Sequence, residues 1–517
     1  MSDTTKSISI VTVLLMISRI FGFIREMVIA AYYGATHQTD AYNMAVIIMG
    51  LSTAVISAGI ATVIIPMYNH RRIQKSKENA DLFASNILCI TSVFYLCLSI
   101  AGIIFAPALV KIFAPNFDEN TIALTVDIIK MTFVFTVIIN ISNFMASIAQ
   151  IHNKFSITIV ANFPFSVFTV VSVICFADKV GIYALVIGYI MFLVTQVFLL
   201  ALSARKVFKF RFKINFKNGD LKEVLKLSLP IYLSVAIWEI NIIIDKVLAS
   251  GLSEGSISLL TYASRLRSLP DGIITASVIT VMFPLLSKYA AEREFAKLKE
   301  ATTKAISLLF MALLPVISIC VYYAEEITKI VYERGVFTPE QTALTANIFT
   351  ISVVSLIFSG VAGLLSNLFY SVQDTKTPQI AAVVTLVSNI AFNLIFVKYL
   401  QLTGLALATS IASLVYFIVS FIQFGLKFGG FGIILFLKNI YKYVLAAAGM
   451  VPLFFVCEIL RGKLPLLPFF TIVLAVSLCF YAFLLYLLKA ELFMESWIQI
   501  KKLKTNKNNI QSVGRRG

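Results

Sequence analysis

Apolar segments of about 20 residues recur along almost the whole of this 517-residue chain. A helix of about 20 apolar residues crosses the hydrocarbon core of a bilayer and satisfies its backbone hydrogen bonds internally. Only 13% of the residues are charged, compared with roughly 25% in soluble proteins. The pattern therefore predicts an all-α polytopic membrane protein.

The apolar segments number about fourteen if each is taken as one span. Their centres lie near residues 20, 54, 95, 136, 166, 192, 238, 272, 312, 356, 388, 414, 448 and 478. The first segment, residues 8–31, is long enough to span and leads directly into the next one, which indicates a retained helix and not a cleaved signal peptide. We therefore expect about fourteen transmembrane helices.

Lysine and arginine gather in alternate loops between the apolar segments. By the positive-inside rule these loops are cytoplasmic, which predicts a bacterial inner-membrane protein with both termini in the cytoplasm. The basic loops contain Arg71, Arg72, Lys75 and Lys77, then Arg205, Lys206, Lys209, Arg211, Lys213, Lys217 and Lys222, then Lys288, Arg293, Lys297 and Lys299. Because the basic residues are spread between spans, the net charge of +17 reflects topology and not a nucleic-acid partner.

A short internal repeat accompanies this pattern. The sequence Thr-Val-Ile-Ile-Pro at 62–66 recurs as Thr-Val-Met-Phe-Pro at 280–284, and Ser142-Asn143 recurs as Ser366-Asn367. Two repeated halves are typical of secondary transporters, which bind their cargo between the halves. The sequence thus predicts two six-helix lobes with a pseudo-twofold repeat, followed by a C-terminal helix pair.

The predicted division of the chain follows from the repeat and the charge pattern. The expected parts are an N-terminal lobe at 1–203, a basic cytoplasmic linker at 204–226, a C-terminal lobe at 227–426, a helix pair at 427–490 and a basic cytoplasmic tail at 491–517. In the linker, residues 206–213 alternate basic with apolar side chains. Such a run can lie on anionic headgroups, although a plain linker that follows the positive-inside rule is the favoured interpretation.

Arginines occur inside the first and eighth predicted spans. An ionisable group at the bilayer centre costs about 2.5–3.5 kcal/mol on insertion scales, so it usually faces a cavity or a partner. The guanidinium groups of Arg19, Arg25 and Arg265 offer planar donor forks that suit phosphate oxygens. They predict an anionic cargo such as a pyrophosphate.

Structural ion pairs are the alternative interpretation of these charges. Arg19 would then pair with Glu26 or Asp40, and Arg265 would pair with Asp271. The sequence Pro270-Asp271-Gly272 also predicts an irregular or kinked helix in the eighth span.

A second polar set lies in the seventh and eleventh predicted spans. Asn241 and Asp245 are four residues apart, as are Asn389 and Asn393, so each pair shares a helix face. One carboxylate with neutral oxygens suits a small cation such as Na⁺, or the carboxylate can carry a proton. Hydrogen bonding between helices explains the same residues equally well.

No catalytic set emerges from the sequence. The six cysteines lie in apolar runs without a close pair, and the three histidines lie at span ends or loops. We therefore expect a transporter and not an enzyme, with no cofactor. The sequence leaves the oligomeric state open, and a monomer is compatible with it.

Several motifs together resemble the MurJ/MviN lipid II flippase family, and they are spread along the chain. They are Ser18-Arg19-Ile20-Phe21-Gly22-Phe23-Ile24-Arg25-Glu26, Gly34-Ala35, Thr39-Asp40-Ala41-Tyr42, Phe283-Pro284-Leu285-Leu286-Ser287, Gln373-Asp374-Thr375-Lys376-Thr377-Pro378 and Gly404-Leu405-Ala406-Leu407-Ala408-Thr409-Ser410. The resemblance implies fourteen helices, with a lipid-tail groove formed by the last two. It also implies export of lipid II, an undecaprenyl-pyrophosphate-linked peptidoglycan precursor, to the outer leaflet by alternating access.

The resemblance assigns roles to individual residues. It matches Arg19, Arg25 and Arg265 to the family's cavity arginines, with Ser18 and Asp40 as polar residues nearby. It further implies a sodium site formed by Asp245, Asn389, Asn393, the carbonyl of Leu405, and Thr409, with Na⁺ as the coupling ion.

This sequence departs from the family pattern at three positions. Thr53 and Ala58 stand where the family has an arginine and a glutamate, and Asn393 stands where a sodium site of this type has an aspartate. The first two departures favour, as an alternative, a flippase for another polyprenyl-linked oligosaccharide. A cation-coupled drug exporter of related fold and a membrane enzyme acting on lipid-linked sugars are more distant alternatives.

Overall fold

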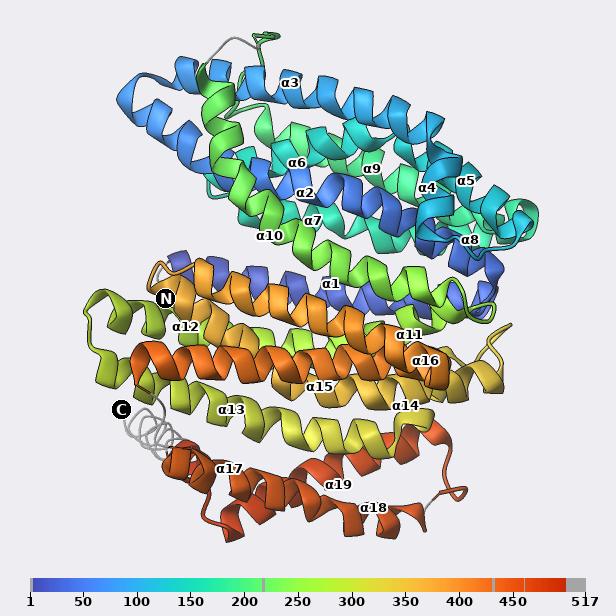
Figure 1. Ribbon diagram of the computed structural model, residues 1–517, viewed down its shortest axis with the longest axis vertical. Coiled ribbons are helices and arrows are strands. Elements are labelled where there is room, and N and C mark those ends of the chain that lie inside the picture. The colour runs from blue at the N-terminus through green and yellow to red at the C-terminus, as the bar shows by residue number, and fades with distance from the viewer. Residues whose placement is uncertain (1–2, 216–218, 430–432, 460, 499–517) are drawn as a thin grey trace, which may run out of the picture. The chain divides into compact units, whose positions relative to one another are not determined.

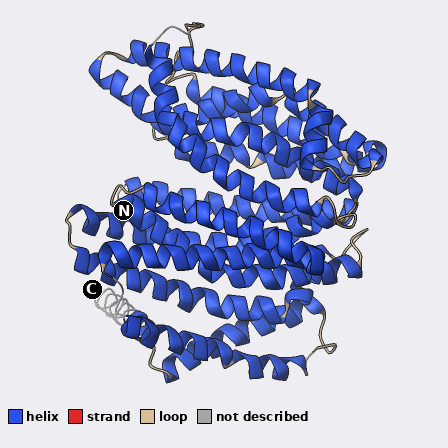
Figure 2. Ribbon diagram, in the orientation of Figure 1, coloured by secondary structure: helices blue, strands red, loops and turns tan. Residues whose placement is uncertain are grey.

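The computed structural model describes residues 3–215, 219–429, 433–459 and 461–498 (Figure 1). Within these ranges all regular secondary structure is helical, as Figure 2 shows. Nine helical segments of this described part are long and apolar enough to cross a membrane, or ten if one bent pair of helices is counted as a span. The prediction of an all-α polytopic membrane protein is confirmed, and the number of fourteen spans stays a prediction.

The chain packs into two compact units, here called unit 1 and unit 2. Unit 1 contains residues up to Tyr262 together with Tyr332–Gln341, and unit 2 contains Ala263–Val331 and the chain from Thr342 onward. The helices of unit 1 are α1 (Asp3–Tyr33), α2 (His37–Gln74), α3 (Lys77–Ile104), α4 (Ala106–Phe113), α5 (Glu119–Phe133), α6 (Thr136–Ile151), α7 (Phe155–Asn162), α8 (Pro164–Val180), α9 (Tyr183–Ala204) and α10 (Gly219–Ala249).

The remaining helices belong wholly or mainly to unit 2. Helix α11 (Ser256–Pro270) begins in unit 1 and ends in unit 2. It is followed by η1 (Asp271–Thr275), α12 (Ala276–Ala291), α13 (Phe295–Tyr322), α14 (Ala324–Tyr332), α15 (Pro339–Ser371), α16 (Lys376–Phe428), α17 (Ile433–Ala448), α18 (Met450–Glu458) and α19 (Leu466–Leu487).

Helix α10 packs along α2, so unit 1 extends beyond the predicted linker at 204–226 (Figure 1). A core of buried apolar side chains joins α2, α3 and α6, and it includes Phe208 from the connection between α9 and α10. The lobe boundaries inferred from the sequence repeat stay predictions. Residues 216–218 of the linker and 499–517 of the tail lie outside the described residues.

The eighth predicted span is interrupted where the sequence suggested. Helix α11 ends at Pro270, and one π-helical turn, η1, leads into α12. Proline lacks a backbone N–H donor, and its ring clashes with the preceding helical turn. Single π-helical turns are often found where a helix bends sharply. The prediction of an irregular helix at Pro270-Asp271-Gly272 is confirmed.

Helix α16 consists of two helices joined at a single non-helical residue, Gln401. The second helix folds back closely on the first: a Cβ added at Gly404 would stand only 2.4 Å from the carbonyl oxygen of Phe396. Glycine at this position allows the close approach of the two backbones.

The C-terminal helices α17, α18 and α19 pack beside α13 (Figure 1). Their buried core centres on Tyr323, Tyr443, Phe454 and Phe469. The segments near 448 and 478, expected to form a C-terminal pair, correspond to α17–α18 and α19.

Candidate functional site

Arg25 lies on α1 in a nearly buried position, with its side chain 11% exposed. Its Nη2 donates to Oε1 of Glu26 at 2.6 Å, and its guanidinium carbon lies 4.1 Å from the centroid of the Phe165 ring on α8. Both contacts stabilise a cation in a poorly hydrated environment. A guanidinium has five N–H donors, and the described residues engage only the one on Nη2, so the others are available to an anion.

Arg19 lies on the same helix, and its side chain is exposed. Ser18 beside it is partly exposed. No hydrogen bond or ion pair joins Arg19 to any residue in the described part of the chain. The alternative that Arg19 pairs with Glu26 or Asp40 is therefore wrong for this structure, because Glu26 binds Arg25 and Asp40 caps another helix.

In unit 2, Arg265 and Arg267 lie on opposite sides of α11, since residues two apart on a helix differ by about 200°. The Arg265 side chain is exposed. Arg267 instead contacts α15, where Nε donates to the carbonyl oxygen of Ser352 at 3.1 Å and to Ser355 Oγ at 3.3 Å, and Nη2 donates to Ser359 Oγ at 3.0 Å. Arg267 thus fixes α11 to α15 just before the π-helical turn.

The sequence reasoning did not assign this role to Arg267. A signal for it was present, because serines at 352, 355 and 359 follow the spacing of one helix face. A polar stripe inside an otherwise apolar span predicts a buried polar partner on a neighbouring helix.

Asp40 lies in the first turn of α2 and is 4% exposed. Its Oδ2 accepts a hydrogen bond from the Gly255 N–H at 2.8 Å, and its Oδ1 accepts from the Ser258 N–H at 2.8 Å and from Ser258 Oγ at 2.6 Å. These donors belong to the start of α11, so the carboxylate satisfies otherwise unpaired N–H groups and complements the helix dipole. Asp40 has this structural role, and its predicted role near the cargo stays a prediction.

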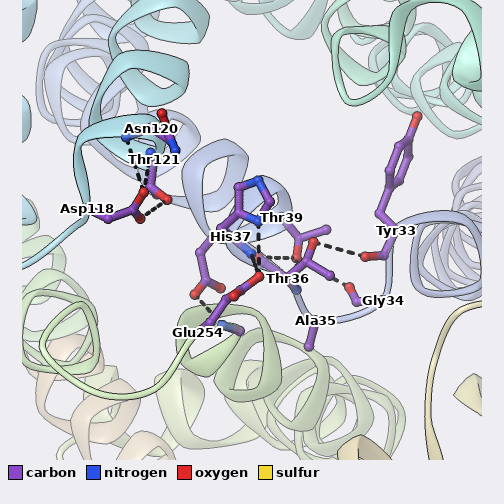
Figure 3. A network of polar contacts seen from close by, with 12 residues as sticks. Tyr33, Gly34, Ala35, Thr36, His37, Thr39, Asp118, Asn120, Thr121 and Glu254 are labelled. Carbon is purple, nitrogen blue, oxygen red and sulfur yellow. Dashed lines mark hydrogen bonds and ion pairs between the residues drawn. The ribbon is translucent and has the colours of Figure 1, made fainter.

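The turn between α1 and α2 contains a dense set of polar contacts (Figure 3). The Thr36 N–H donates to Thr39 Oγ1 at 2.9 Å, and the N–H of His37 donates to Oε1 of Glu254 at 2.9 Å. The His37 Nδ1 lies 3.0 Å from the same carboxylate oxygen. The backbone and side-chain hydrogen bonds from His37 lower the pKa of Glu254 below its usual range.

Hydrogen bonds to main-chain oxygens connect this turn to a later segment of unit 1, Tyr332–Gln341. The Val336 N–H donates to the Ala31 carbonyl at 3.0 Å, and Gln341 Nε2 donates to the Ala35 carbonyl at 2.9 Å. Gly335 has a φ of +61°, and a Cβ there would stand 2.0 Å from the Ala31 oxygen. We call residues 31–41, 254–262 and 332–341 with these contacts the turn network.

The second predicted polar set is partly assembled in unit 2. Asn389 and Asn393 are completely buried on the first helix of α16. Asn393 Nδ2 donates to Asn389 Oδ1 at 2.9 Å, and Asn389 Nδ2 donates to Thr409 Oγ1 at 3.2 Å across the fold of α16. Leu405 is buried on the same second helix as Thr409. Asp245 lies on α10 in unit 1, so its membership of one ligand set with these residues stays a prediction.

The many apolar helices of the described residues, with arginines inside a candidate span, define a polytopic membrane protein. Its fold is similar to that of a multidrug resistance MATE family transporter of the MOP superfamily in an inward-facing conformation. The TM-score is 0.67 at 17% sequence identity, covering 82% of this chain and 98% of that one. At this identity the similarity concerns the fold alone.

Residues 29–493 match the family described as Lipid II flippase MurJ, so the chain belongs to that family. A probable lipid II flippase MurJ from Rickettsia prowazekii is 28% identical over 410 residues, which cover 78% of this chain and 80% of the relative. A probable lipid II flippase MurJ from Aquifex aeolicus is 25% identical over 92% of each chain. A solved structure of lipid II flippase MurJ in an inward closed conformation has a TM-score of 0.81 and 25% identity, and covers 93% of this chain and 99% of that one.

Proposed function

We propose that this protein moves lipid II from the cytoplasmic to the outer leaflet of the bacterial inner membrane, where lipid II serves cell-wall synthesis. The observation that carries the proposal is the family match, which extends over residues 29–493. The protein acts as a transporter and changes no covalent bond in its cargo. Both termini are cytoplasmic, as the distribution of basic loops predicts.

The pyrophosphate of the cargo binds to Arg19, Arg25 and Arg265. Arg25 supports this role because Glu26 and Phe165 hold its guanidinium while other N–H groups stay available. Arg19 supports it because its exposed guanidinium has no partner in the described part of the chain. Ser18 adds a hydroxyl donor beside Arg19.

Transport proceeds by alternating access. With the termini in the cytoplasm, the turn network lies on the outer side, and its contacts close that side while the cytoplasmic side receives lipid II. An inside-negative potential favours export of the anion by about 2.3 kcal/mol per charge per 100 mV if the charge crosses the whole field.

The polyprenyl tail stays in the lipid phase along α17, α18 and α19. Sodium binds Asp245, Asn389, Asn393, the Leu405 carbonyl and Thr409, and its inward movement drives the return step. Oxygen ligands of this kind suit Na⁺. The contacts among Asn389, Asn393 and Thr409 support this part of the proposal.

One observation favours a second candidate, a flippase for a different polyprenyl-linked oligosaccharide. Thr53 is buried, and its Oγ1 donates to the carbonyl oxygens of Met49 and Gly50 at 3.0 and 3.2 Å. It therefore supplies no cation where the family has an arginine. The side chain of Ala58, where the family has a glutamate, lies outside those that the structure describes.

The test is complementation of cells depleted of their own lipid II flippase. Growth and labelling of lipid II on the outer face are measured with the parent, with Arg25→Ala, and with Arg72→Ala as a matched control. Arg72 is exposed near the end of α2. All three proteins are compared at equal expression.

Rescue by the parent and by Arg72→Ala, but not by Arg25→Ala, is the expected result. Rescue by both arginine variants would refute the role of Arg25. Failure of a well-expressed parent would refute lipid II as the cargo and favour the second candidate, which the same cells supplied with other lipid-linked oligosaccharides would then test.

A further inference from the structure

The connection between α9 and α10 is fixed along α3 and is not a free linker. The N–H of Lys209 donates to Asp81 Oδ2 at 3.3 Å, and the N–H of Arg211 donates to Ser85 Oγ at 3.1 Å. Asn215 exchanges two hydrogen bonds with Asn86, at 2.7 and 3.3 Å. The N–H groups of Lys209, Arg211 and Asn215, which are two or four residues apart, thus face α3. Residues 208–215 form no helix, so the backbone here is extended.

The acceptors on α3 are buried and preorganised for this contact. Asp81, Ser85 and Asn86 are at most 3% exposed. Asp81 also accepts a hydrogen bond from the Tyr68 hydroxyl at 2.7 Å. Buried polar groups of this kind are costly unless paired, so the contact holds the connection in one position.

Residues 206–215, here called the connecting segment, have two different faces along their extended part, residues 208–215. Phe208 is buried in the core of unit 1. The following apolar side chains project away from the protein, with Phe210 52%, Phe212 78% and Ile214 41% exposed. Basic residues alternate with them, because side chains two apart share one face of an extended chain.

The basic face is largely unneutralised. Arg211 has one weak and exposed ion pair with Glu78 at 3.4 Å. Lys206, Lys209 and Lys213 have no carboxylate partner among the described residues. The basic residues around the start of α13 differ, since Lys297 and Lys304 each pair with a glutamate within 3.0 Å.

The position on α3 puts the connecting segment at the level of lipid headgroups. Helix α3 has 28 residues and is about 42 Å long, which exceeds the hydrocarbon thickness of about 30 Å. The hydrogen bonds of the segment to this candidate span all lie within its first ten residues. Exposed Phe and aliphatic side chains next to basic residues bury themselves at the boundary between headgroups and acyl chains, and the basic residues there contact anionic headgroups.

We propose that the connecting segment is an interfacial anchor that binds anionic phospholipids. Phe210, Phe212 and Ile214 enter the boundary between headgroups and acyl chains. The basic side chains contact the lipid phosphates, each strengthening the preference for anionic lipid about fivefold. This anchor is independent of which cargo the protein carries.

A tryptophan probe tests the depth of the segment. Phe212→Trp is placed in full-length protein whose native tryptophans are removed by Trp238→Phe and Trp497→Phe, and the protein is reconstituted in phosphatidylcholine–phosphatidylglycerol vesicles with brominated acyl chains. The matched control is Gln74→Trp, an exposed polar position at the end of α2. We expect blue-shifted emission and strong quenching by the brominated chains only for Phe212→Trp. Quenching by aqueous acrylamide to the same degree at both positions would overturn the proposal.

A second measurement tests the lipid charge. With the same probe, quenching by brominated phosphatidylglycerol is compared with quenching by brominated phosphatidylcholine. Replacing Lys209, Arg211 and Lys213 by glutamine is expected to lower the preference for phosphatidylglycerol at least tenfold, whereas glutamine at Lys288, Lys297 and Lys304 leaves it unchanged. An equal effect of both triple variants, or none of either, would refute binding of anionic lipid and indicate that the aromatic face serves another partner.

Discussion

Replacement of Asp40 by asparagine tests whether this carboxylate holds the start of α11. The carboxylate accepts three hydrogen bonds of 2.6–2.8 Å from Gly255 and Ser258 in a site where Asp40 is 4% exposed. Asparagine has one oxygen, so its NH₂ group must face one of these donors. A buried N–H left unpaired costs about 1–3 kcal/mol, and loss of the negative charge at a helix N-terminus adds about 0.3–1 kcal/mol. We expect local destabilisation of about 2–3 kcal/mol.

Hydrogen exchange measured by mass spectrometry reports this local opening. In detergent-solubilised Asp40→Asn protein, the amides at 255–260 are expected to exchange about 30-fold faster or more, which corresponds to about 2 kcal/mol. The matched control is Asp118→Asn. Asp118 caps α5 through the N–H groups of Asn120 and Thr121 at an exposed site, where asparagine caps nearly as well as aspartate.

The contrast between the two variants decides the outcome. Asp118→Asn is expected to change exchange in α5 less than threefold, since its cost is about 0.5 kcal/mol or less. A change below threefold at 255–260 in Asp40→Asn, or equal changes in both variants, would refute the reasoning that burial makes the Asp40 cap essential.

Three further predictions concern other parts of the molecule. Gly335→Ala is expected to lower stability by more than 2 kcal/mol, because its Cβ would meet a carbonyl oxygen at 2.0 Å. Gly462→Ala, which also has a positive φ, of +80°, but has open space around the added Cβ, is expected to cost about 1 kcal/mol. Thermal unfolding of both variants compares them, and equal losses would contradict the steric argument. Burial alone would raise the pKa of Asp374, but the hydrogen bonds from Lys427 and Thr377 together with the Lys427 charge outweigh it and hold the pKa at about 2. The carboxylate therefore stabilises the fold above pH 4, and this contribution is lost as the pH falls through 2. Denaturation of Asp374→Asn should show a loss of about 1 kcal/mol at pH 7, a value discounted for exposure of the lysine, and only a small part of it near pH 2. An equal loss at both pH values would contradict it. Asn393→Asp adds a carboxylate to the predicted sodium site, so we expect the apparent affinity for Na⁺ to increase at least tenfold. Thermal stabilisation by Na⁺ relative to K⁺ measures this affinity, and indifference of both proteins to Na⁺ would refute the site.

The class of fold could be predicted from the sequence because the lipid bilayer permits few structures for long apolar segments. Long apolar segments in lipid must be helices, and the break at Pro270 follows from the missing proline donor and the π-helical turn after it. The position of the C-terminal helices could likewise be read from their hydropathy. The packing boundary at Tyr262 could not be read in this way, since it depends on α10 lying along α2.

The sequence identified which residues belong to the candidate site, but it could not identify most of the partners that they contact. The arginines of α1 were recognised from their cost in a span, yet the sequence could not show that Glu26 would pair with Arg25 and not with Arg19. Asp40 meets donors 215 and 218 residues away, and no local pattern carries that information. Arg267 was missed although its serine partners on α15 are visible in the sequence as a periodic stripe.

The turn network is held by links of unequal strength. Single hydrogen bonds to main-chain oxygens join it at Ala31, Gly34 and Ala35, whereas other links end on the carboxylates of Asp40 and Glu254. Water replaces each main-chain link with a net loss of only about 0.5–1.5 kcal/mol, so these three links together contribute about 1.5–4.5 kcal/mol. Forms of the protein in which these three links are made or hydrated therefore differ by only a few kcal/mol, and a ligand that prefers one form shifts the balance between them. A larger side chain at Gly335 or Gly255 would prevent these main-chain contacts from forming, because its Cβ would collide with the carbonyl oxygen of Ala31 or Ala35. Changes in the polarity of nearby side chains would shift the balance between the two forms and leave both possible.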